Sequence, residues 1–143
     1  METKFNSQVS TTIEQSKKLI ELGLKSETAD MAWCGKMYRG GNQYPPSGEH
    51  LMWLCMGYEN NVQFYSKRHD IDVIPTWSLH RLIEICPSFA GGYMLTVSGN
   101  HVYYMDEEGY TIYSAIRANL YDNFVDCIEW LIKGNDFNEE YLK

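Results

Sequence analysis

The residues best suited to chemistry in this sequence are His80 and Glu84, which lie four positions apart in a predicted helix. Side chains at this spacing meet on one helix face, so the two could act as a general acid and base. The same geometry equally suits an ordinary surface hydrogen bond. Cys86 follows two residues later, but a thiol nucleophile needs a lowered pKa and an oriented base. An isolated cysteine is more often part of a core.

A second constellation, His69, Asp70 and Asp72, combines the imidazole and carboxylate groups that can share a divalent metal ion. A His-Asp metallohydrolase would need further histidines at helical spacing, and none follows nearby. The alternative is a polar loop that leads into the next helix. Arg39-Gly40-Gly41 lacks the Lys-Ser/Thr pair of a phosphate-binding loop. We therefore expect no metal and no cofactor.

Two predicted loops have features of a protein-binding surface. The loop over 39–50 is rich in aromatic residues and proline, and a hairpin tip carries three consecutive acidic residues. The alternative for both is a plain solvated turn, which is the commoner use of such residues. The candidate partner-binding residues are Tyr38, Tyr44, His50, Asp106, Glu107 and Glu108.

The charge balance limits the class of partner. The 143 residues include 12 basic and 19 acidic side chains, which gives a formal net charge of −7. Such a chain repels a phosphate backbone, so direct nucleic-acid binding is not expected. The first ten residues are polar, and no apolar run approaches the roughly 20 residues of a membrane span. Four scattered cysteines are typical of buried thiols in a reducing compartment, so we expect a cytoplasmic protein without membrane association.

Three amphipathic helices are predicted. The first covers 12–22, between a capping-box pattern and Gly23, which can end a helix. The second follows Thr76, its expected N-cap, and ends before Pro87. The third is the clearest, because apolar residues recur at helical spacing over 120–131.

Strands are predicted from apolar runs and from alternation between turn signals. The run over 51–56 suits a strand buried on both faces, and it is expected to form a hairpin over 51–66. Three later segments read as an antiparallel meander with one face available for helices. The predicted strands are 31–39, 51–56, 93–97, 102–105 and 110–113.

Together these elements predict an α+β fold. We expect an antiparallel sheet of hairpins and a meander, with about three helices packed on one of its faces. No linker or internal repeat divides the chain, so residues 1–143 are interpreted as a single domain. Residues 1–10 are expected to form a flexible leader.

Three segments, TTIEQSKKLIELGL (11–24), IPTWSLHRLIEICP (74–87) and FVDCIEWLIKG (124–134), carry a resemblance. As a set they resemble small uncharacterised proteins encoded in gut-bacterial genomes, often within prophages or other mobile elements. The resemblance covers most of the chain except about 25–70. It implies a cytoplasmic accessory role and assigns no functional residue.

Three classes of function are left open. The first is a non-enzymatic interaction or regulatory protein that binds another protein, which the acidity and aromatic content favour. The second is a small enzyme or ligand-binding protein that uses His80 and Glu84, or His69 and Asp72. The third is a homo-oligomeric structural component, because sheet surface is expected to lie uncovered.

Overall fold

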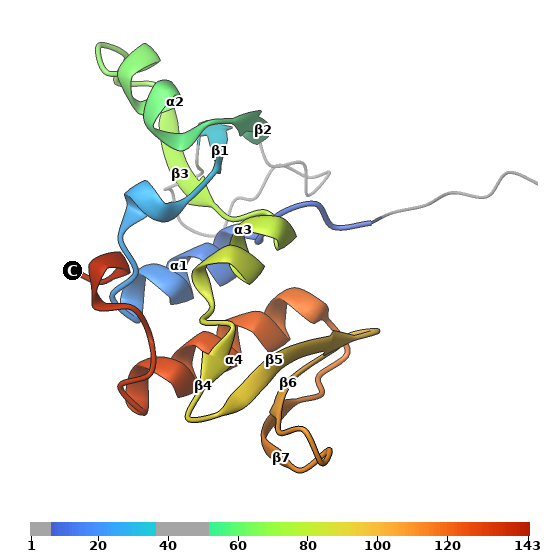
Figure 1. Cartoon of the computed structure of the whole chain (residues 1–143). Coiled ribbons are helices and arrows are strands. Elements are labelled where there is room, and N and C mark those ends of the chain that lie inside the picture. Colours follow the sequence, from blue (N-terminus) through green and yellow to red (C-terminus); the bar gives the residue numbers. More distant parts are fainter. Residues whose placement is uncertain (1–6, 37–51) are drawn as a thin grey trace, which may run out of the picture.

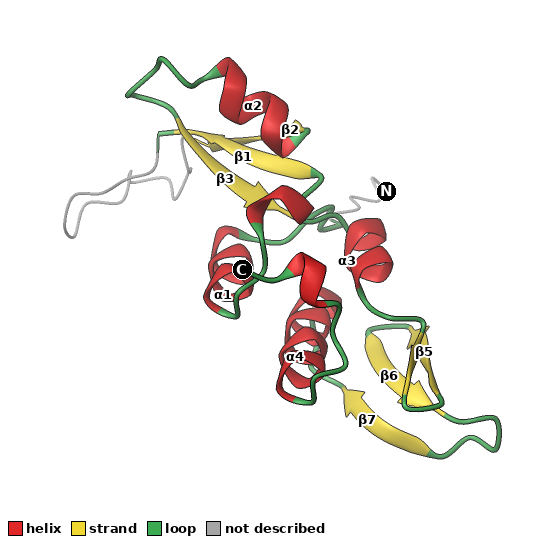
Figure 2. Ribbon diagram, turned by 60° about the vertical axis from the view of Figure 1, so that its left-hand side comes forward, coloured by secondary structure: helices red, strands yellow, loops and turns green. Residues whose placement is uncertain are grey.

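The protein has an α+β fold in which helices lie between two antiparallel sheets (Figure 1). The computed structural model describes residues 7–36 and 52–143. A three-stranded sheet with a short helix forms one end of the molecule and a four-stranded sheet forms the other, as a second view also shows (Figure 2). The single sheet that the sequence predicted is therefore two sheets.

Helix α1 (Ile13–Glu21) forms as its sequence predicts. The Thr12 hydroxyl accepts from Gln15 N at 3.1 Å, and Gln15 Oε1 accepts from Thr12 N at 3.0 Å, which completes the capping box. Gly23 ends the helix with φ of +103°, a conformation that side-chain-bearing residues rarely adopt. Leu24 then turns back, and its N–H donates to Leu19 O at 3.1 Å.

The first sheet has the strand order β2-β1-β3, with β1 (Met31–Gly35) at its centre. Strands β2 (Met52–Met56) and β3 (Asp72–Thr76) pair antiparallel on either side of it. The expectation that the run over 51–56 is buried on both faces is wrong. Trp53 and Met56 point to opposite faces of β2, and both are exposed.

The predicted hairpin over 51–66 is also wrong, since helix α2 (Tyr58–Phe64) follows β2. Gly57 makes the turn with φ of +76°, and the Asn61 side chain donates to the carbonyls of Met56 and Gly57. Val62 and Phe64 alternate with polar residues as they would in a strand, but both are exposed on the helix. A local side-chain bond thus decides the conformation of this segment.

Helix α3 (Leu79–Ile85) begins later than predicted. Its N-cap is Ser78, whose hydroxyl accepts from Arg81 N at 3.2 Å. Thr76, the expected cap, is the buried last residue of β3. Asp30 fixes the start of the helix, because its carboxylate accepts from the backbone N–H and the hydroxyl of Ser78.

The second sheet contains the predicted meander. Its strand order is β4-β5-β6-β7, all antiparallel, and Gly99 and Asn100 form the tight turn between β5 and β6. A short strand precedes the three predicted ones. The bounds are β4 (Phe89–Ala90), β5 (Tyr93–Ser98), β6 (His101–Met105) and β7 (Thr111–Ala115).

Helix α4 (Leu120–Lys133) lies across β6 and β7 and supplies much of the core. Asn119 caps its start, and Gly134 follows its last turn. Two short 3₁₀ turns, η1 (Ser26–Thr28) and η2 (Glu139–Tyr141), bring the C-terminal segment beside the end of α1. The three helices that pack in the interior are therefore those that the sequence predicts.

The two halves of the molecule meet at a buried threonine, Thr11. Its backbone N–H donates to Trp77 O at 2.9 Å, and its carbonyl accepts from Trp33 Nε1 at 3.0 Å. Its hydroxyl bonds to those of Ser16 and Thr76, each at 2.7 Å, and accepts from Trp77 N at 3.0 Å. This junction joins the N-terminal segment to both β3 and α1. Of the predicted leader 1–10, Gln8 bonds to Asn119 and Tyr121, and Ser10 is buried and pairs with Ser78.

Replacing Thr11 with valine keeps the side-chain shape but removes the hydroxyl. The buried polar groups of Ser16, Thr76 and Trp77 then lose a partner, so we expect the free energy of unfolding to fall by about 1–3 kcal/mol. Urea unfolding measures this, with Thr96→Val as control, because the Thr96 hydroxyl makes only one long contact, 3.3 Å, at the surface. Equal midpoints for the two variants would contradict the role of this junction.

Candidate functional site

His80 and Glu84 meet as their spacing predicts, with 3.1 Å between His80 Nε2 and Glu84 Oε1. The pair lies on the outside of α3, and the His80 side chain is 83% exposed. This is the arrangement of a surface hydrogen bond. A general acid-base pair works best where the protein excludes water from the reacting groups, and this pair lies in solvent.

The Cys86 thiol is buried against Cys127 at the C-terminal end of α3. Its hydrogen bond with Cys127 and its burial both raise the pKa of the Cys86 thiol well above the ordinary value. A thiolate nucleophile needs the opposite shift. Burial similarly raises the pKa of Cys34 to about 12, beside Cys55 in the first sheet. Cys34, Cys86 and Cys127 therefore behave as core groups, whereas Cys55 is partly exposed.

The residues around His69 form a polar turn between α2 and β3. Asp70 bonds to Arg68, with 2.8 Å between Asp70 Oδ2 and Arg68 Nη2, and this hydrogen bond lowers the pKa of the Asp70 carboxyl. Asp72 is the first residue of β3. Within residues 7–36 and 52–143, no three histidine, cysteine, aspartate or glutamate side chains are grouped as metal ligands.

The predicted partner-binding residues fall in two places. Tyr38, Tyr44 and His50 lie outside the described residues. Asp106 closes the β6–β7 turn, because its Oδ1 accepts from Glu108 N at 3.0 Å and from Tyr110 N at 2.8 Å. The side chains of Glu107 and Glu108 are left exposed at the tip of this turn. We call Asp106, Glu107 and Glu108 the acidic tip.

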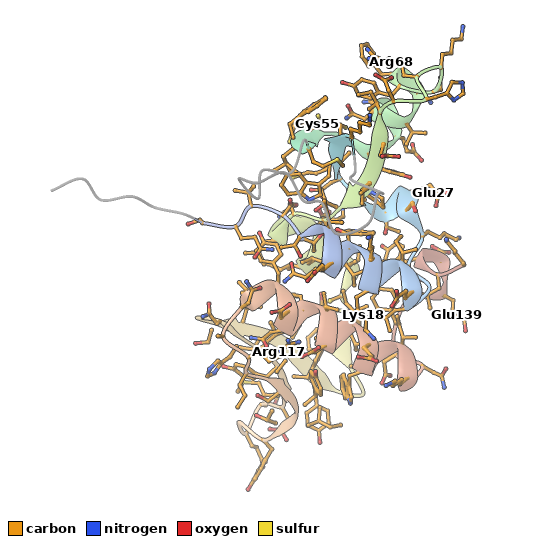
Figure 3. The ribbon with its side chains drawn as sticks, turned by 180° about the vertical axis from the view of Figure 1, so that it is seen from behind. Lys18, Glu27, Cys55, Arg68, Arg117 and Glu139 are labelled. Atoms are coloured by element: carbon orange, nitrogen blue, oxygen red, sulfur yellow. The ribbon has the colours of Figure 1, made fainter. Side chains whose placement is uncertain are left out.

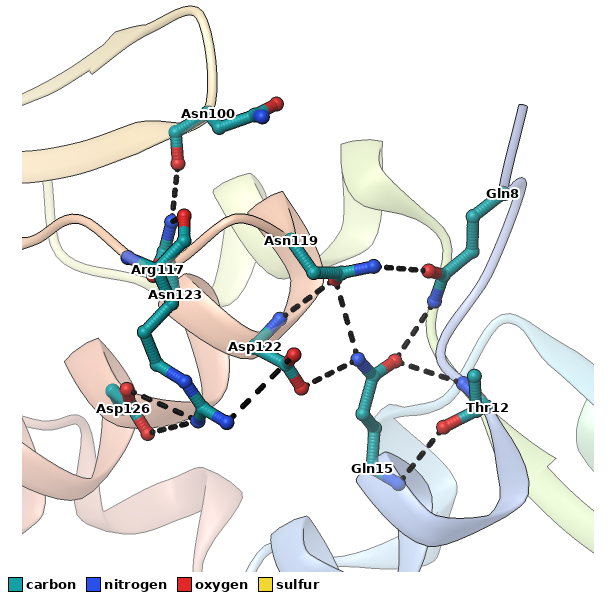
Figure 4. A network of polar contacts seen from close by, with 9 residues as sticks. All are labelled: Gln8, Thr12, Gln15, Asn100, Arg117, Asn119, Asp122, Asn123 and Asp126. Atoms are coloured by element: carbon teal, nitrogen blue, oxygen red, sulfur yellow. Dashed lines mark hydrogen bonds and ion pairs between the residues drawn. The ribbon is translucent and has the colours of Figure 1, made fainter. Parts of the chain in front are cut away.

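An open groove of about 480 Å³ lies between the N-terminal halves of α1 and α4. Gln15 is at its centre (Figure 4). The Gln15 amide donates to Asp122 Oδ1 at 2.8 Å and to Asn119 Oδ1 at 3.3 Å, while its Oε1 accepts from Gln8 Nε2 at 2.8 Å. Since these groups satisfy one another, we interpret the groove as a structural joint between the two helices.

Ion pairs extend the same joint along α4. Lys18 of α1 lies 3.7 Å from Glu129, and Arg117 lies 3.4 Å from Asp126. Viewed from behind, Lys18 and Arg117 lie beside α4, whereas Cys55 belongs to the sheet at the far end of the molecule (Figure 3). The Lys18–Glu129 pair joins α1 to α4, and the Arg117–Asp126 pair joins the segment after β7 to α4.

The inner face of the four-stranded sheet is covered by α4. Across β5, β6 and β7 it presents two rows of paired residues, Leu95–Tyr104–Tyr113 and Val97–Val102–Ala115. Tyr113 stacks on Trp130 of α4 with ring centroids 4.5 Å apart, and burial raises the pKa of Tyr113 to about 12. Neighbouring residues of a strand point to opposite faces, so the residues between these rows point away from α4.

The opposite side, which we call the outer face, has an apolar row at one end, a mixed row beside it, and the exposed pair Ser98 and His101 at the other end. One row pairs Phe89 with Met94 and Met105, and the next pairs Thr96 with Tyr103 and Ser114. Phe89 is 64% exposed and Met94 is 49% exposed. A contiguous exposed apolar patch on a folded protein commonly marks a site of contact with another molecule.

The acidic tip borders this face directly, because Asp106 follows Met105 at the end of β6. The sequence analysis did not predict the outer face, because it assigned Met94, Tyr103 and Met105 only to strands of the meander. A signal was present: the positions of β5 and β6 that alternate with the inner rows include Met94, Tyr103 and Met105, whereas the predicted helices were expected to cover only one face.

Comparison with known protein families, with curated proteins and with solved structures finds no match for this chain. The resemblance to proteins of gut-bacterial mobile elements therefore stays a prediction. Among the helices of the described residues, none combines the length and apolarity needed to cross a membrane.

The buried thiols give a chemical test. At pH 8 we expect Ellman's reagent to modify the partly exposed Cys55 first in the folded protein, and Cys86, Cys34 and Cys127 only after unfolding in urea. The Cys55→Ser variant is the control, because it should remove the early reaction and leave the late ones. Rapid modification of Cys86 in the folded variant would instead support a reactive thiol at the end of α3.

Proposed function

We propose that this protein is a non-enzymatic interaction protein that binds another protein through the outer face of its four-stranded sheet. The observation that carries the proposal is the apolar row Phe89–Met94–Met105, in which Phe89 and Met94 are exposed and no side chain is charged. We further propose that it acts in the cytoplasm as an accessory protein of a phage or mobile element, as the sequence resemblance implies.

The residue types on the outer face suit contact with a protein. Phenylalanine, tyrosine and methionine are enriched at the centres of interfaces, where charged residues are depleted. Met94 and Met105 can adapt their flexible side chains to the shape of a partner. Phe89 and Tyr103 contribute rigid apolar area, which contacts a partner at a small cost in conformational entropy.

The charges beside the face indicate the chemistry of the partner. Glu107 and Glu108 lie exposed at one end of it, and the whole chain carries a formal net charge of −7. An acidic margin attracts a complementary surface and increases its association rate. The partner is therefore a protein that presents an apolar patch with lysine or arginine at one edge.

The catalytic alternative receives less support from the geometry. His80 and Glu84 bond to each other in solvent on α3. Gln15, Asn119 and Asp122, which line the groove between α1 and α4, are already hydrogen-bonded to one another. An enzyme site needs polar groups that converge on a concavity and are left for the substrate.

The proposal predicts that charges placed on the outer face abolish partner binding. The variant F89D/M94D should lose a protein that wild type captures, after cross-linking, from an extract of the native host, because each aspartate must be desolvated at the contact. The matched control is Ile83→Asp, on an exposed apolar residue of α3. Circular dichroism and urea unfolding check that each variant folds.

The acidic tip gives a second arm of the same experiment. The variant E107A/E108A should retain the partner but bind it more slowly and with weaker dependence on salt. Loss of the partner from Ile83→Asp, or its full retention by F89D/M94D, would contradict the assignment of the outer face.

A further inference from the structure

Strand β7 is an edge strand with one side open. Among the described residues it pairs with β6 on one side and with no strand on the other, and it ends the strand order β4-β5-β6-β7. In an antiparallel sheet alternate residues direct their backbone N–H and C=O groups to opposite sides, so β7 presents unpaired groups along its open side. Thr111, Ile112 and Ser114 are all exposed along this edge.

Two features that often protect an edge strand, charged side chains and proline, are absent from this edge. Residues 110–116, with the sequence YTIYSAI, are seven consecutive uncharged residues without proline or lysine. They are rich in β-branched and aromatic side chains, which favour strand pairing. A register shift between Tyr104 and Met105 leaves Ile112 without a partner on β6, while Tyr113–Ala115 pair with β6 in regular register. The opposite edge, β4, has only two residues.

We infer that β7 pairs with β7 of a second copy of this chain. In a symmetric antiparallel pair centred on Ser114, Ile112 of one copy lies opposite Ile116 of the other, and the same contact occurs twice. The side chains of these isoleucines are 51% and 67% exposed in the single chain. This register therefore covers two apolar residues of each copy and uses the open backbone groups of both.

The charges at the two ends of the strand favour a second copy as the occupant. The acidic tip precedes β7, and Arg117 follows it. The Arg117 guanidinium reaches Asp122 and Asp126 of its own chain, and its side chain is still 59% exposed. Antiparallel pairing about Ser114 sets Arg117 opposite Thr111 of the second copy, next to that copy's acidic tip. Opposite charges thus approach at both ends, whereas a parallel arrangement would bring the two acidic tips together.

The two-fold axis of this pair is perpendicular to the sheet, so corresponding faces stay on the same side. The outer faces of the two copies form one continuous surface, and both α4 helices lie on the other side. Each copy contributes its only long edge of this sheet, so the assembly closes at two chains. The binding of a partner to this continuous surface rests on the proposed function. The dimer itself does not, because it forms without any other protein.

The register is tested by two variants that place charges at the same positions. In I112K/I116K, lysine faces lysine across the proposed pair, and we expect the molecular mass of a single chain. In I112E/I116K, glutamate faces lysine, and we expect twice the chain mass, as for wild type. Sedimentation equilibrium over a dilution series gives the masses. Because both variants bear two charges at the same two positions, a general folding defect would affect both.

A cross-link tests the axis. Cysteines at position 114 of two copies lie directly opposite each other, within the Cα separation that a disulfide requires. We expect Ser114→Cys to form a covalent dimer under mild oxidation at low concentration, and Ser98→Cys, exposed at the end of β5, to remain largely monomeric. A monomeric wild type at every concentration, or equal masses for the two charged variants, would overturn the inference. The proposed function is tested separately, by comparing how much partner wild type and F89D/M94D capture.

Discussion

The structure depends on the hydrogen bonds made by one buried polar group, the hydroxyl of Thr11. This hydroxyl lies where the N-terminal segment, α1 and the end of β3 meet, and it reaches two other hydroxyls and one backbone N–H. Without these bonds each of the buried groups would carry a desolvation cost. Beside them, the Asp30 carboxylate binds both the backbone and the hydroxyl of Ser78, which sets the start of α3. The first sheet and the central helices are thereby joined in one arrangement.

This arrangement determines what is left for binding. Helices α1 and α3 pack where the two halves of the molecule meet. Helix α4 packs on the second sheet and covers one of its faces. Asn123 of α4 holds that sheet in place, because its buried side chain accepts from Arg117 N at 2.7 Å and donates to the carbonyl oxygens of Asn100 and Arg117. The hairpin and the end of β7 are fixed from the inner side, while the outer face and the β7 edge stay accessible. A rigid sheet with an open face and an open edge is suited to contact proteins without changing shape.

Local signals in the sequence predicted the elements whose stability is local. The Thr12 and Gln15 capping box defines α1, apolar spacing defines α4, and the turn at Gly99 defines the β5–β6 hairpin. Errors occurred where distant contacts decide. Thr76 is a residue type that commonly caps helices, but its hydroxyl bonds in the core to Thr11, 65 positions earlier in the chain. Ser78 is the N-cap of α3 instead. The exposed faces could not be predicted, because one sequence does not reveal which apolar surface lacks a covering helix.

The central claim is that the outer face contacts a protein in its native setting, and oxidation of methionine by dilute hydrogen peroxide tests it directly. Met94 and Met105 lie on that face, and Met56, 74% exposed in the first sheet, serves as an internal reference. Peptide mass spectrometry gives the oxidation rate of each in the purified protein and in an extract of the native host. The account predicts that the extract slows oxidation of Met94 and Met105 relative to Met56. An unchanged ratio of the rates would contradict it.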